Sequence, residues 1–387
     1  MKVQRRAADL LAEQARRSGA PSYVTFQVTD RCNYRCTHCY QEHLGKDELS
    51  TEEVMDILEQ LAEAGVLFLT LMGGEYFMRP DADAILTRAH ELGFAIKVLS
   101  TGHHITEKRA DFLATIRPLQ VDISIYGSKP HIHESVTEMN GSWERSIAAI
   151  RRLVARKIPV VLKTPVMDNN VDDLKDIAAM AESLGVQFSF DPKLTAVENG
   201  DLETIRARMN EEQLAEFYRD TMADFVATSF GEAPNRDLRP LGQTPCRAGQ
   251  DVCSVNQRGE VWPCTSLPVP VGDLRKQRFA EIWSGSDQLE DVRGLKWATI
   301  KECNECPVRS YCTRCHAMAL IEDGNMRGPS LEACRHAVVI RDSLRESGRI
   351  PSTETHLPPT WNRVSADGQH DRLSRSGKRV VSLKVID

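Results

Sequence analysis

The chain has 387 residues, of which 41% are hydrophobic and 27% charged, so it is long enough for one large core or for two domains. The formal net charge is −6, and Lys and Arg are interspersed with Asp and Glu, which excludes a large basic surface for nucleic acid. The start, MKVQRRAADLLAEQARR, lacks the uninterrupted apolar stretch of a signal peptide, and no later apolar run approaches the ~20 residues of a membrane span. We therefore expect a cytoplasmic protein that binds neither nucleic acid nor membranes.

Six short apolar, β-rich segments follow an expected helical lead-in over residues 1–22, and a helical pattern succeeds each of them. The segments are YVTFQV, VLFLTL, FAIKVL, LQVDISI, IPVVLKT and VQFSF. Strands that alternate with helices require a parallel sheet with both faces covered. Six units suit an open barrel better than a closed one of about eight, so the predicted fold class is α/β, a partial (β/α)6 barrel over residues 23–230. A doubly wound sheet is the alternative that periodicity leaves open.

Helix signals accompany these strands. Ser50 and Glu53 have the spacing of a capping box, and apolar residues at helical spacing follow them, beginning with Val54, Ile57 and Leu58. A further long helix is expected from about Glu211 to Thr228.

The remainder of the chain differs in composition. GEAPNRDLRPLGQTP is rich in Gly and Pro and marks a linker. A small, loop-rich and cysteine-dense domain is expected over residues 231–345, closed by a helix from Leu331 to about Leu344. The polar residues 346–387 are expected to form a mostly mobile tail.

The eleven cysteines are the outlier of the composition, because an odd number of clustered thiols in a reducing cytoplasm indicates metal binding rather than disulfides. Cys32, Cys36 and Cys39 form a C-x3-C-x2-C loop directly after the first predicted strand, where βα loops build active sites. Three thiolates can hold a 4Fe–4S cluster and leave one iron open for a substrate. The alternatives are a zinc site with His38 as fourth ligand, or three unconnected buried thiols.

This loop, TDRCNYRCTHCY, resembles that of the radical SAM superfamily, whose members bind S-adenosylmethionine (SAM) through its amino and carboxylate groups to the open iron. The resemblance implies that His38, just before the third cysteine, packs near the adenine of SAM. A surface loop histidine is the alternative for this position.

LMGGEYF, after the second predicted strand, matches a second family motif. It implies that Gly73 and Gly74 leave room for SAM and that Glu75 pairs with its ammonium group, although glycine pairs are often only turns. Ser124, at the end of the fourth strand, resembles the family's polar contact to the SAM carboxylate, or bonds locally at the strand end. Two departures from the family are STG at residues 100–102, where a polar-Asn-Gly turn is usual, and the missing arginine in HESVTEMNGSW.

The eight C-terminal cysteines suffice for two further complete clusters, or for two zinc sites. Their spacing, with Gly259 five positions before Cys264, resembles the SPASM domain, which holds two auxiliary iron–sulfur clusters. The two residues between Cys312 and Cys315 depart from the usual three. The resemblance implies a first auxiliary cluster on Cys246, Cys253, Cys264 and Cys315, and a second on Cys303, Cys306, Cys312 and Cys334.

The resemblance also implies the reaction. An electron from an external donor would cleave SAM reductively to a 5′-deoxyadenosyl radical, which abstracts hydrogen from a peptide or protein side chain to give a cross-link, a thioether or an oxidation. A separate peptide-binding protein is an expected partner. Alternatives are a small-molecule enzyme, such as a haem-pathway decarboxylase or a molybdopterin-type cyclase, and a non-catalytic electron carrier. The pattern assigns no catalytic acid or base; Tyr126 and Asp191 are expected to face the cavity.

Overall fold

The computed structural model describes residues 19–43, 45–223 and 239–350. Most of the expected N-terminal lead-in, the end of the helix expected to reach Thr228, and the tail from Pro351 lie outside the described residues. The described residues form two compact units. The first holds those up to Pro192 together with Arg247–Val292, and the second holds those of Lys193–Cys246 and those from Arg293 onward.

The first unit is built on a nine-stranded sheet with the strand order β6-β5-β4-β3-β2-β1-β7-β8-β9. The first six strands are parallel neighbours in chain order, and the sheet does not close, which confirms the predicted α/β fold with a partial barrel of six units. The six strands are β1 (Tyr23–Gln27), β2 (Phe68–Met72), β3 (Ala95–Ser100), β4 (Gln120–Ser124), β5 (Val160–Pro165) and β6 (Gln187–Asp191).

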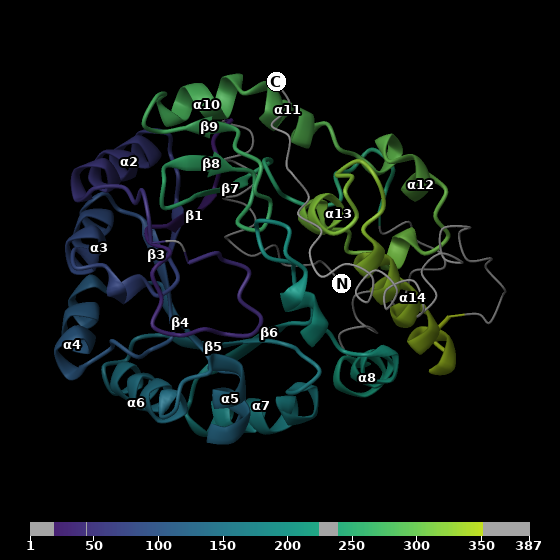
Figure 1. The fold of residues 1–387 in the computed structure, drawn as a ribbon, viewed down its shortest axis with the longest axis horizontal. Coiled ribbons are helices and arrows are strands. Elements are labelled where there is room, and N and C mark those ends of the chain that lie inside the picture. The colour runs from purple at the N-terminus through teal and green to yellow at the C-terminus, as the bar shows by residue number, and fades with distance from the viewer. Residues whose placement is uncertain (1–18, 44, 224–238, 351–387) are drawn as a thin grey trace, which may run out of the picture. The chain divides into compact units, whose positions relative to one another are not determined.

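Helices connect these strands, and Figure 1 shows α2, α3, α4 and α6 in an arc along one side of the sheet. That side is apolar, as in β3, where Ile96 and Val98 are 2% and 0% exposed while the alternate residues Ala95, Lys97 and Leu99 are partly exposed. The connecting elements are α2 (Thr51–Glu63), η1 (Tyr76–Met78), α3 (Ala82–Glu91), α4 (Glu107–Ile116), α5 (Pro130–Thr137), α6 (Ser142–Ala155), η2 (Val171–Asp173) and α7 (Leu174–Ser183).

Helix α2 shows why the local sequence folds as it does. The Ser50 hydroxyl accepts from the Glu53 backbone N–H at 3.2 Å and the Glu53 carboxylate accepts from the Ser50 N–H at 2.7 Å, which confirms the predicted capping box. Val54, Ile57 and Leu58 are at most 2% exposed. Burial of each such side chain contributes about 1.5–3 kcal/mol, so the stripe fixes α2 against the sheet.

Three short strands extend the sheet beyond β1. β7 (Val252–Val255) pairs parallel with β1, and β8 (Glu260–Trp262) and β9 (Gly272–Asp273) follow antiparallel. Residues 247–292, expected in the C-terminal domain, thus belong to the first unit, together with α10 (Phe279–Gly285) and nearly all of α11 (Asp287–Arg293). The domain boundaries drawn at residues 230 and 345 stay predictions.

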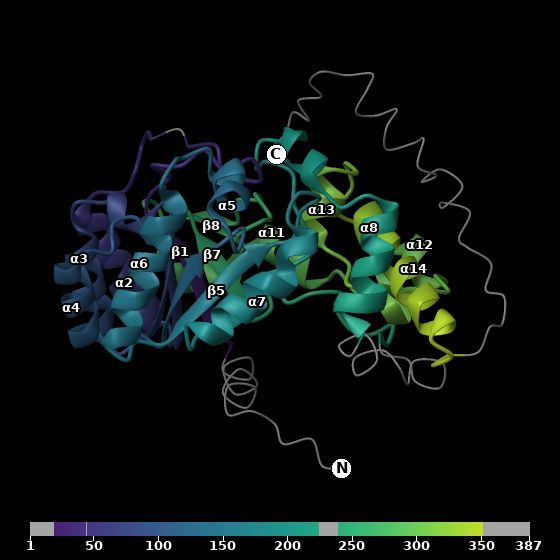
Figure 2. The same ribbon diagram turned by 90° about the horizontal axis from the view of Figure 1, so that it is seen from below.

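The second unit is helical among its described residues. Helix α14 starts at Leu331 as predicted and continues to Glu346; it packs against α8, η4, η7 and α13, and Figure 2 shows α8 beside it. The elements of this unit are η3 (Glu203–Ala207), α8 (Glu211–Glu216), the π-turn η4 (Phe217–Thr221), η6 (Trp297–Thr299), α12 (Lys301–Asn304), η7 (Arg309–Tyr311), α13 (His316–Ile321) and α14.

Candidate active site

The cysteine loop leaves the carboxyl end of β1 and is held by backbone bonds to two neighbours. The Val28 N–H donates to the Met72 carbonyl of β2 at 2.9 Å, and the Thr37 N–H donates to the Val136 carbonyl of α5 at 3.0 Å. Inside the loop, the Cys39 N–H donates to the Cys36 carbonyl at 3.0 Å. All three cysteines are half-buried. Backbone hydrogen bonds therefore fix the conformation of the loop at the mouth of the barrel, where the sequence predicts it.

The electrostatics of the loop suit a cationic cluster. Burial raises the pKa of Cys32, and it raises that of Cys36 strongly, with further contributions from the charges of Cys39 and Cys32. At neutral pH these thiols therefore stay protonated in the absence of a metal, and a bound cluster would replace their protons. Among the described residues, no three thiols, imidazoles or carboxylates converge on a point for one metal ion. A cubane does not need such a point, because each cysteine binds a different iron.

Aromatic side chains line one side of the loop. The Tyr126 hydroxyl lies 4.0 Å from Cys36 Sγ, and its ring packs edge-on against His38 with centroids 4.8 Å apart. Burial lowers the pKa of His38 to about 4, so its imidazole is neutral at physiological pH. His38 Nδ1 is buried and has no hydrogen-bond partner among the described residues. A buried polar atom of this kind fits a ligand contact at the predicted adenine position.

A further histidine, which the sequence did not single out, contacts the loop. His43 Nε2 lies 3.1 Å from Cys39 Sγ, and its Nδ1 lies 2.8 Å from the Asp30 carbonyl. The only signal in the sequence is a histidine four positions after the last cysteine of the loop.

Gly73 and Gly74 allow the end of β2 to approach the start of the cysteine loop. A Cβ on Gly73 would meet the Thr29 carbonyl oxygen at 2.6 Å, and one on Gly74 would meet the Arg31 carbonyl oxygen at 2.6 Å. The Gly74 N–H donates to the Thr29 carbonyl at 3.0 Å. No side chain fits at either position without displacing the loop, so the glycine pair is required by this contact whatever binds beside it.

Glu75 is 1% exposed, and its carboxylate accepts four hydrogen bonds. One oxygen accepts from the Phe77 N–H at 3.1 Å and the Ser100 hydroxyl at 2.8 Å; the other accepts from the Thr101 N–H and hydroxyl, both at 2.7 Å. The STG sequence that departs from the family pattern thus supplies three of the four donors. The charge of Glu75 also raises the pKa of Cys32, which shows that the carboxylate lies close to the cysteine loop.

Ser124 ends β4 on the face of the sheet opposite the helices, since the preceding Ile123 lies toward α6. A hydrogen bond to Ser124 lowers the pKa of Tyr126, although burial dominates and raises that pKa well above its usual value. Ser124 therefore lies in one group with Tyr126 and Cys36. Asp191 ends β6 and is exposed.

The same face carries charged residues deeper in the barrel. Asp122 is 4% exposed and lies 3.8 Å from the Lys163 ammonium, which also donates to Ser189 at 3.1 Å. Burial raises the pKa of Asp122, and the charges of Lys163 and Lys97 oppose that rise. Asp122, Lys163 and Ser189 thus form a polar cluster on the inner wall, beside Leu99 of β3 and Val161 of β5 on the same face.

The C-terminal cysteines are divided between the two units. Cys253 lies in β7 and Cys264 follows β8 in the first unit, whereas Cys246 and Cys315 belong to the second. Gly259, in the turn between β7 and β8, has φ +88°, which favours glycine. Joint ligation of the first auxiliary cluster by these four cysteines stays a prediction.

The four cysteines assigned to the second auxiliary cluster all lie in the second unit. Burial raises the pKa of Cys312 to about 12 and that of Cys303 to about 11. Burial also raises the pKa of Cys334 strongly, and the charges of Cys312, Cys303 and Cys306 raise it further, so Cys334 lies within electrostatic range of the other three thiols. This soft, mutually repelling donor set fits an iron–sulfur cluster.

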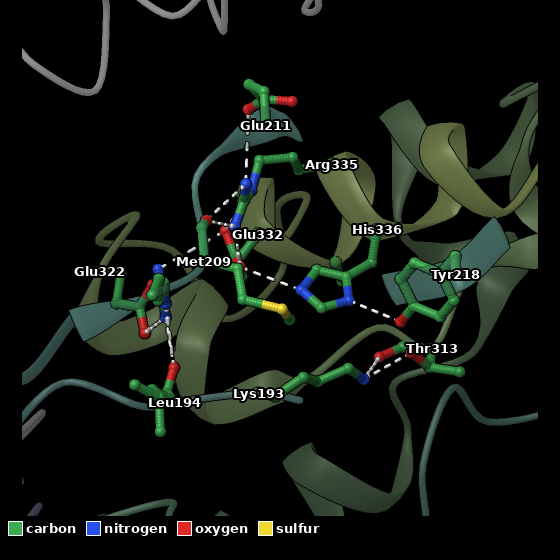
Figure 3. A network of polar contacts seen from close by, with 12 residues as sticks. Lys193, Leu194, Met209, Glu211, Tyr218, Thr313, Glu322, Glu332, Arg335 and His336 are labelled. Carbon is green, nitrogen blue, oxygen red and sulfur yellow. Dashed lines mark hydrogen bonds and ion pairs between the residues drawn. The ribbon is translucent and has the colours of Figure 1, made fainter. Parts of the chain in front are cut away.

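A buried ionic network holds the helix that carries Cys334 (Figure 3). Glu332 of α14 accepts from Arg335 at 2.9 Å and from His336 at 3.0 Å, and its side chain is 1% exposed. The other ring nitrogen of His336 bonds the Tyr218 hydroxyl at 2.7 Å, and Arg335 donates to the Met209 carbonyl at 3.1 Å. The network fixes the start of α14 against the 209–218 segment.

Two protein-family models match this chain. A model of the radical SAM superfamily matches residues 26–181, and a model of the iron–sulfur cluster-binding SPASM domain matches residues 246–307. The AdoMet-dependent heme synthase of Methanosarcina barkeri is 25% identical over 80% of this chain and 95% of its own length. The PqqA peptide cyclase of Xanthomonas campestris is 25% identical over 86% of this chain and 93% of its own.

Among solved structures, Streptococcus suis SuiB bound to its precursor peptide SuiA has the same fold, with a TM-score of 0.66 at 14% identity over 82% of this chain and 77% of that chain. Within the described residues, no helix is long and apolar enough to cross a membrane. The two matched domains imply S-adenosylmethionine and multiple iron–sulfur clusters as cofactors. With its three-cysteine loop at the barrel mouth and its cysteine-rich C-terminal region, the chain carries a radical SAM domain and a SPASM domain.

Proposed function

We propose that this radical SAM enzyme modifies a side chain of a peptide or protein, and that it acts in the cytoplasm, whose reducing conditions preserve thiols and clusters. When bound, SAM and its cluster supply hydrogen-abstracting radical chemistry. In this proposal Cys32, Cys36 and Cys39 hold that cluster.

The residues around the loop are proposed to bind SAM. His38 offers its unpartnered Nδ1, and Ser124 offers a hydroxyl at the same side of the loop. The Glu75 carboxylate has about four lone-pair positions, and four hydrogen-bond donors of the protein already use them. In this proposal the SAM ammonium therefore pairs with a Glu75 oxygen that also accepts from the STG donors. The eight C-terminal cysteines hold the two auxiliary clusters with the ligand sets given above.

The polar cluster of Asp122, Lys163 and Ser189 on the inner wall of the barrel is the observation that carries the choice of substrate. A peptide backbone and its polar side chains match the hydrogen-bonding groups of Asp122, Lys163 and Ser189, whereas a tetrapyrrole macrocycle needs extended apolar contact. β6 pairs with β5 and ends the sheet order, so a peptide can also add to it as a further strand. The peptide cyclase relative agrees with this choice.

A second candidate is a small-molecule reaction on a tetrapyrrole, as in a haem-pathway decarboxylase. The match to the heme synthase of Methanosarcina barkeri over 95% of its length favours it, and Lys97 and Lys163 would then pair with substrate carboxylates.

The test is to incubate the reconstituted enzyme without oxygen with SAM, a reductant as external electron donor, and peptides encoded near its gene. A separate peptide-binding protein encoded there would be added where one exists. Mass spectrometry should find a defined change, such as loss of about two hydrogens, that the Cys32→Ala, Cys36→Ala, Cys39→Ala triple variant does not produce. Unmodified peptides together with turnover of a porphyrin would replace the peptide proposal with the second candidate.

A further inference from the structure

The buried surroundings of the second cysteine set are rich in cations. Four thiolates bring a large negative charge into a region of low dielectric, which is costly unless positive groups or hydrogen bonds compensate it. Arg314 is 2% exposed and lies between Cys312 and Cys315 in the sequence. Its charge lowers the pKa of Cys303 against the larger effect of burial, and the charge of Lys193 does the same for Cys312.

Arg314 and Lys193 already use their donors elsewhere. The Arg314 guanidinium donates to the carbonyls of Met326 and Gly328, and Lys193 donates to the Thr313 carbonyl at 2.7 Å. Figure 3 shows the Lys193 side chain reaching Thr313. Arg314 also makes a side-chain hydrogen bond to Cys303, whereas Lys193 acts on Cys312 through its charge. The bonds of both cations to backbone carbonyls give them firm positions that do not depend on a cluster.

Arg341 of α14 is different. It is 5% exposed, and one edge of its guanidinium binds Asp342, with Nε at 2.8 Å and Nη2 at 3.0 Å from the carboxylate oxygens. Its third nitrogen, Nη1, is fully buried and finds no acceptor among the described residues. A buried guanidinium N–H without an acceptor is costly, so such a donor is expected to have a partner that the described residues do not supply.

The position of Arg341 identifies that partner. Arg341 stands seven positions after Cys334, and positions i and i+7 share one face of a helix. A long helical side chain also leans toward the N-terminus of its helix, here toward Cys334. The charge of Arg341 also lowers the pKa of Cys306, after the larger effect of Arg309, so the guanidinium lies within electrostatic reach of that one cysteine of the set.

We propose that Arg341 Nη1 donates a hydrogen bond to a sulfur of the second auxiliary cluster, either a sulfide or the Cys306 thiolate, and thereby makes this cluster easier to reduce. A donor to a cluster sulfur stabilises the reduced state more than the oxidised state, because reduction adds negative charge at the sulfurs. Arg341 is thus a positioning and potential-setting residue, not a catalytic one. The proposal depends on the cluster assignment but not on the identity of the substrate.

The test is a redox titration, monitored by electron paramagnetic resonance, of the second auxiliary cluster in the triple variant that lacks the N-terminal cluster. Its signal is identified as the one that Cys303→Ala removes. Arg341→Met, which keeps the length of the side chain without its donors, should lower the reduced-to-oxidised ratio at a fixed potential at least about tenfold, which is a shift of about 59 mV for one electron. Arg206→Met is the matched control, because Arg206 is 53% exposed in the same unit and pairs with Glu203; no shift is expected there.

An unchanged potential in an Arg341→Met protein with full iron content would overturn the proposal. If that variant folds by circular dichroism but does not retain the cluster, the native Arg341 is examined instead, by pulsed resonance with 15N-labelled arginine. A 15N coupling to the reduced second cluster then supports the hydrogen bond. Its absence would show that Nη1 faces water or a part of the chain other than the cluster.

Discussion

The prediction most directly tied to the active-site geometry concerns Glu75→Gln. The substitution keeps the size of the side chain but replaces one acceptor oxygen with an NH2 group. If the remaining oxygen faces the two Thr101 donors, the new amide faces the Phe77 N–H and the Ser100 hydroxyl. The hydroxyl can rotate, whereas the Phe77 N–H cannot and loses its acceptor.

The magnitude follows from these bonds. An orphaned buried N–H costs about 1–3 kcal/mol, and the bonds that remain change from charge-assisted to neutral, so we expect a loss of about 2–4 kcal/mol in the free energy of unfolding. Chemical denaturation of the cluster-free protein measures this. Glu107→Gln is the matched control: Glu107 is 65% exposed in an ion pair with Arg152, where the expected loss is below about 1 kcal/mol.

The Glu75→Gln variant should also change the reactivity of the Cys32 thiol. Because the charge of Glu75 raises the pKa of Cys32, its removal lowers that pKa, increases the thiolate fraction at a given pH, and speeds alkylation of Cys32 in the cluster-free protein. In the reconstituted protein, SAM affinity should fall while iron content is retained. Stability within about 0.5 kcal/mol of the wild type would refute the four-bond arrangement, and unchanged SAM affinity would refute the ammonium contact.

Three further predictions follow. Changing Cys32, Cys36 and Cys39 together to Ala should remove about a third of roughly twelve irons per chain and all SAM cleavage, by iron assay and chromatography of the products, and an active, iron-free zinc protein would contradict this. Gly74→Ala should disorder the cysteine loop and lower cluster occupancy, since its Cβ would approach a backbone carbonyl to 2.6 Å; full iron content would show that the loop adapts. Glu332→Gln should cost about 3–5 kcal/mol in denaturation experiments because it leaves buried arginines uncompensated, and a cost below about 1 kcal/mol would contradict the buried network.

Much of the first unit was predictable because its signals are local. The six strands, the cap at Ser50 and the position of the cysteine loop depend on periodicity and on side chains a few residues apart, and the structure confirms them. The start of α14 at Leu331 was predictable for the same reason.

Features that depend on distant contacts were not predictable. The strand β7 is four residues long, and only its pairing with β1, about 230 residues earlier, makes it part of the barrel sheet. Periodicity likewise cannot show that Thr101 reaches Glu75, or that Arg341 keeps a nitrogen without a partner among the described residues. The proposed SAM contacts of His38 and Ser124 stay predictions.

The pairing of β7 with β1 also affects how the protein is made. Until Val255 has left the ribosome, β1 is the edge strand of the growing sheet, and its unpaired N–H and C=O groups face solvent beside the cysteine loop. A fragment that ends with the residues of the radical SAM match, at 181, therefore lacks the strand that covers this edge and is prone to aggregate through it. Support for the loop is complete only after most of the chain has been synthesised, so stable insertion of the first cluster is expected to be a late, post-translational event.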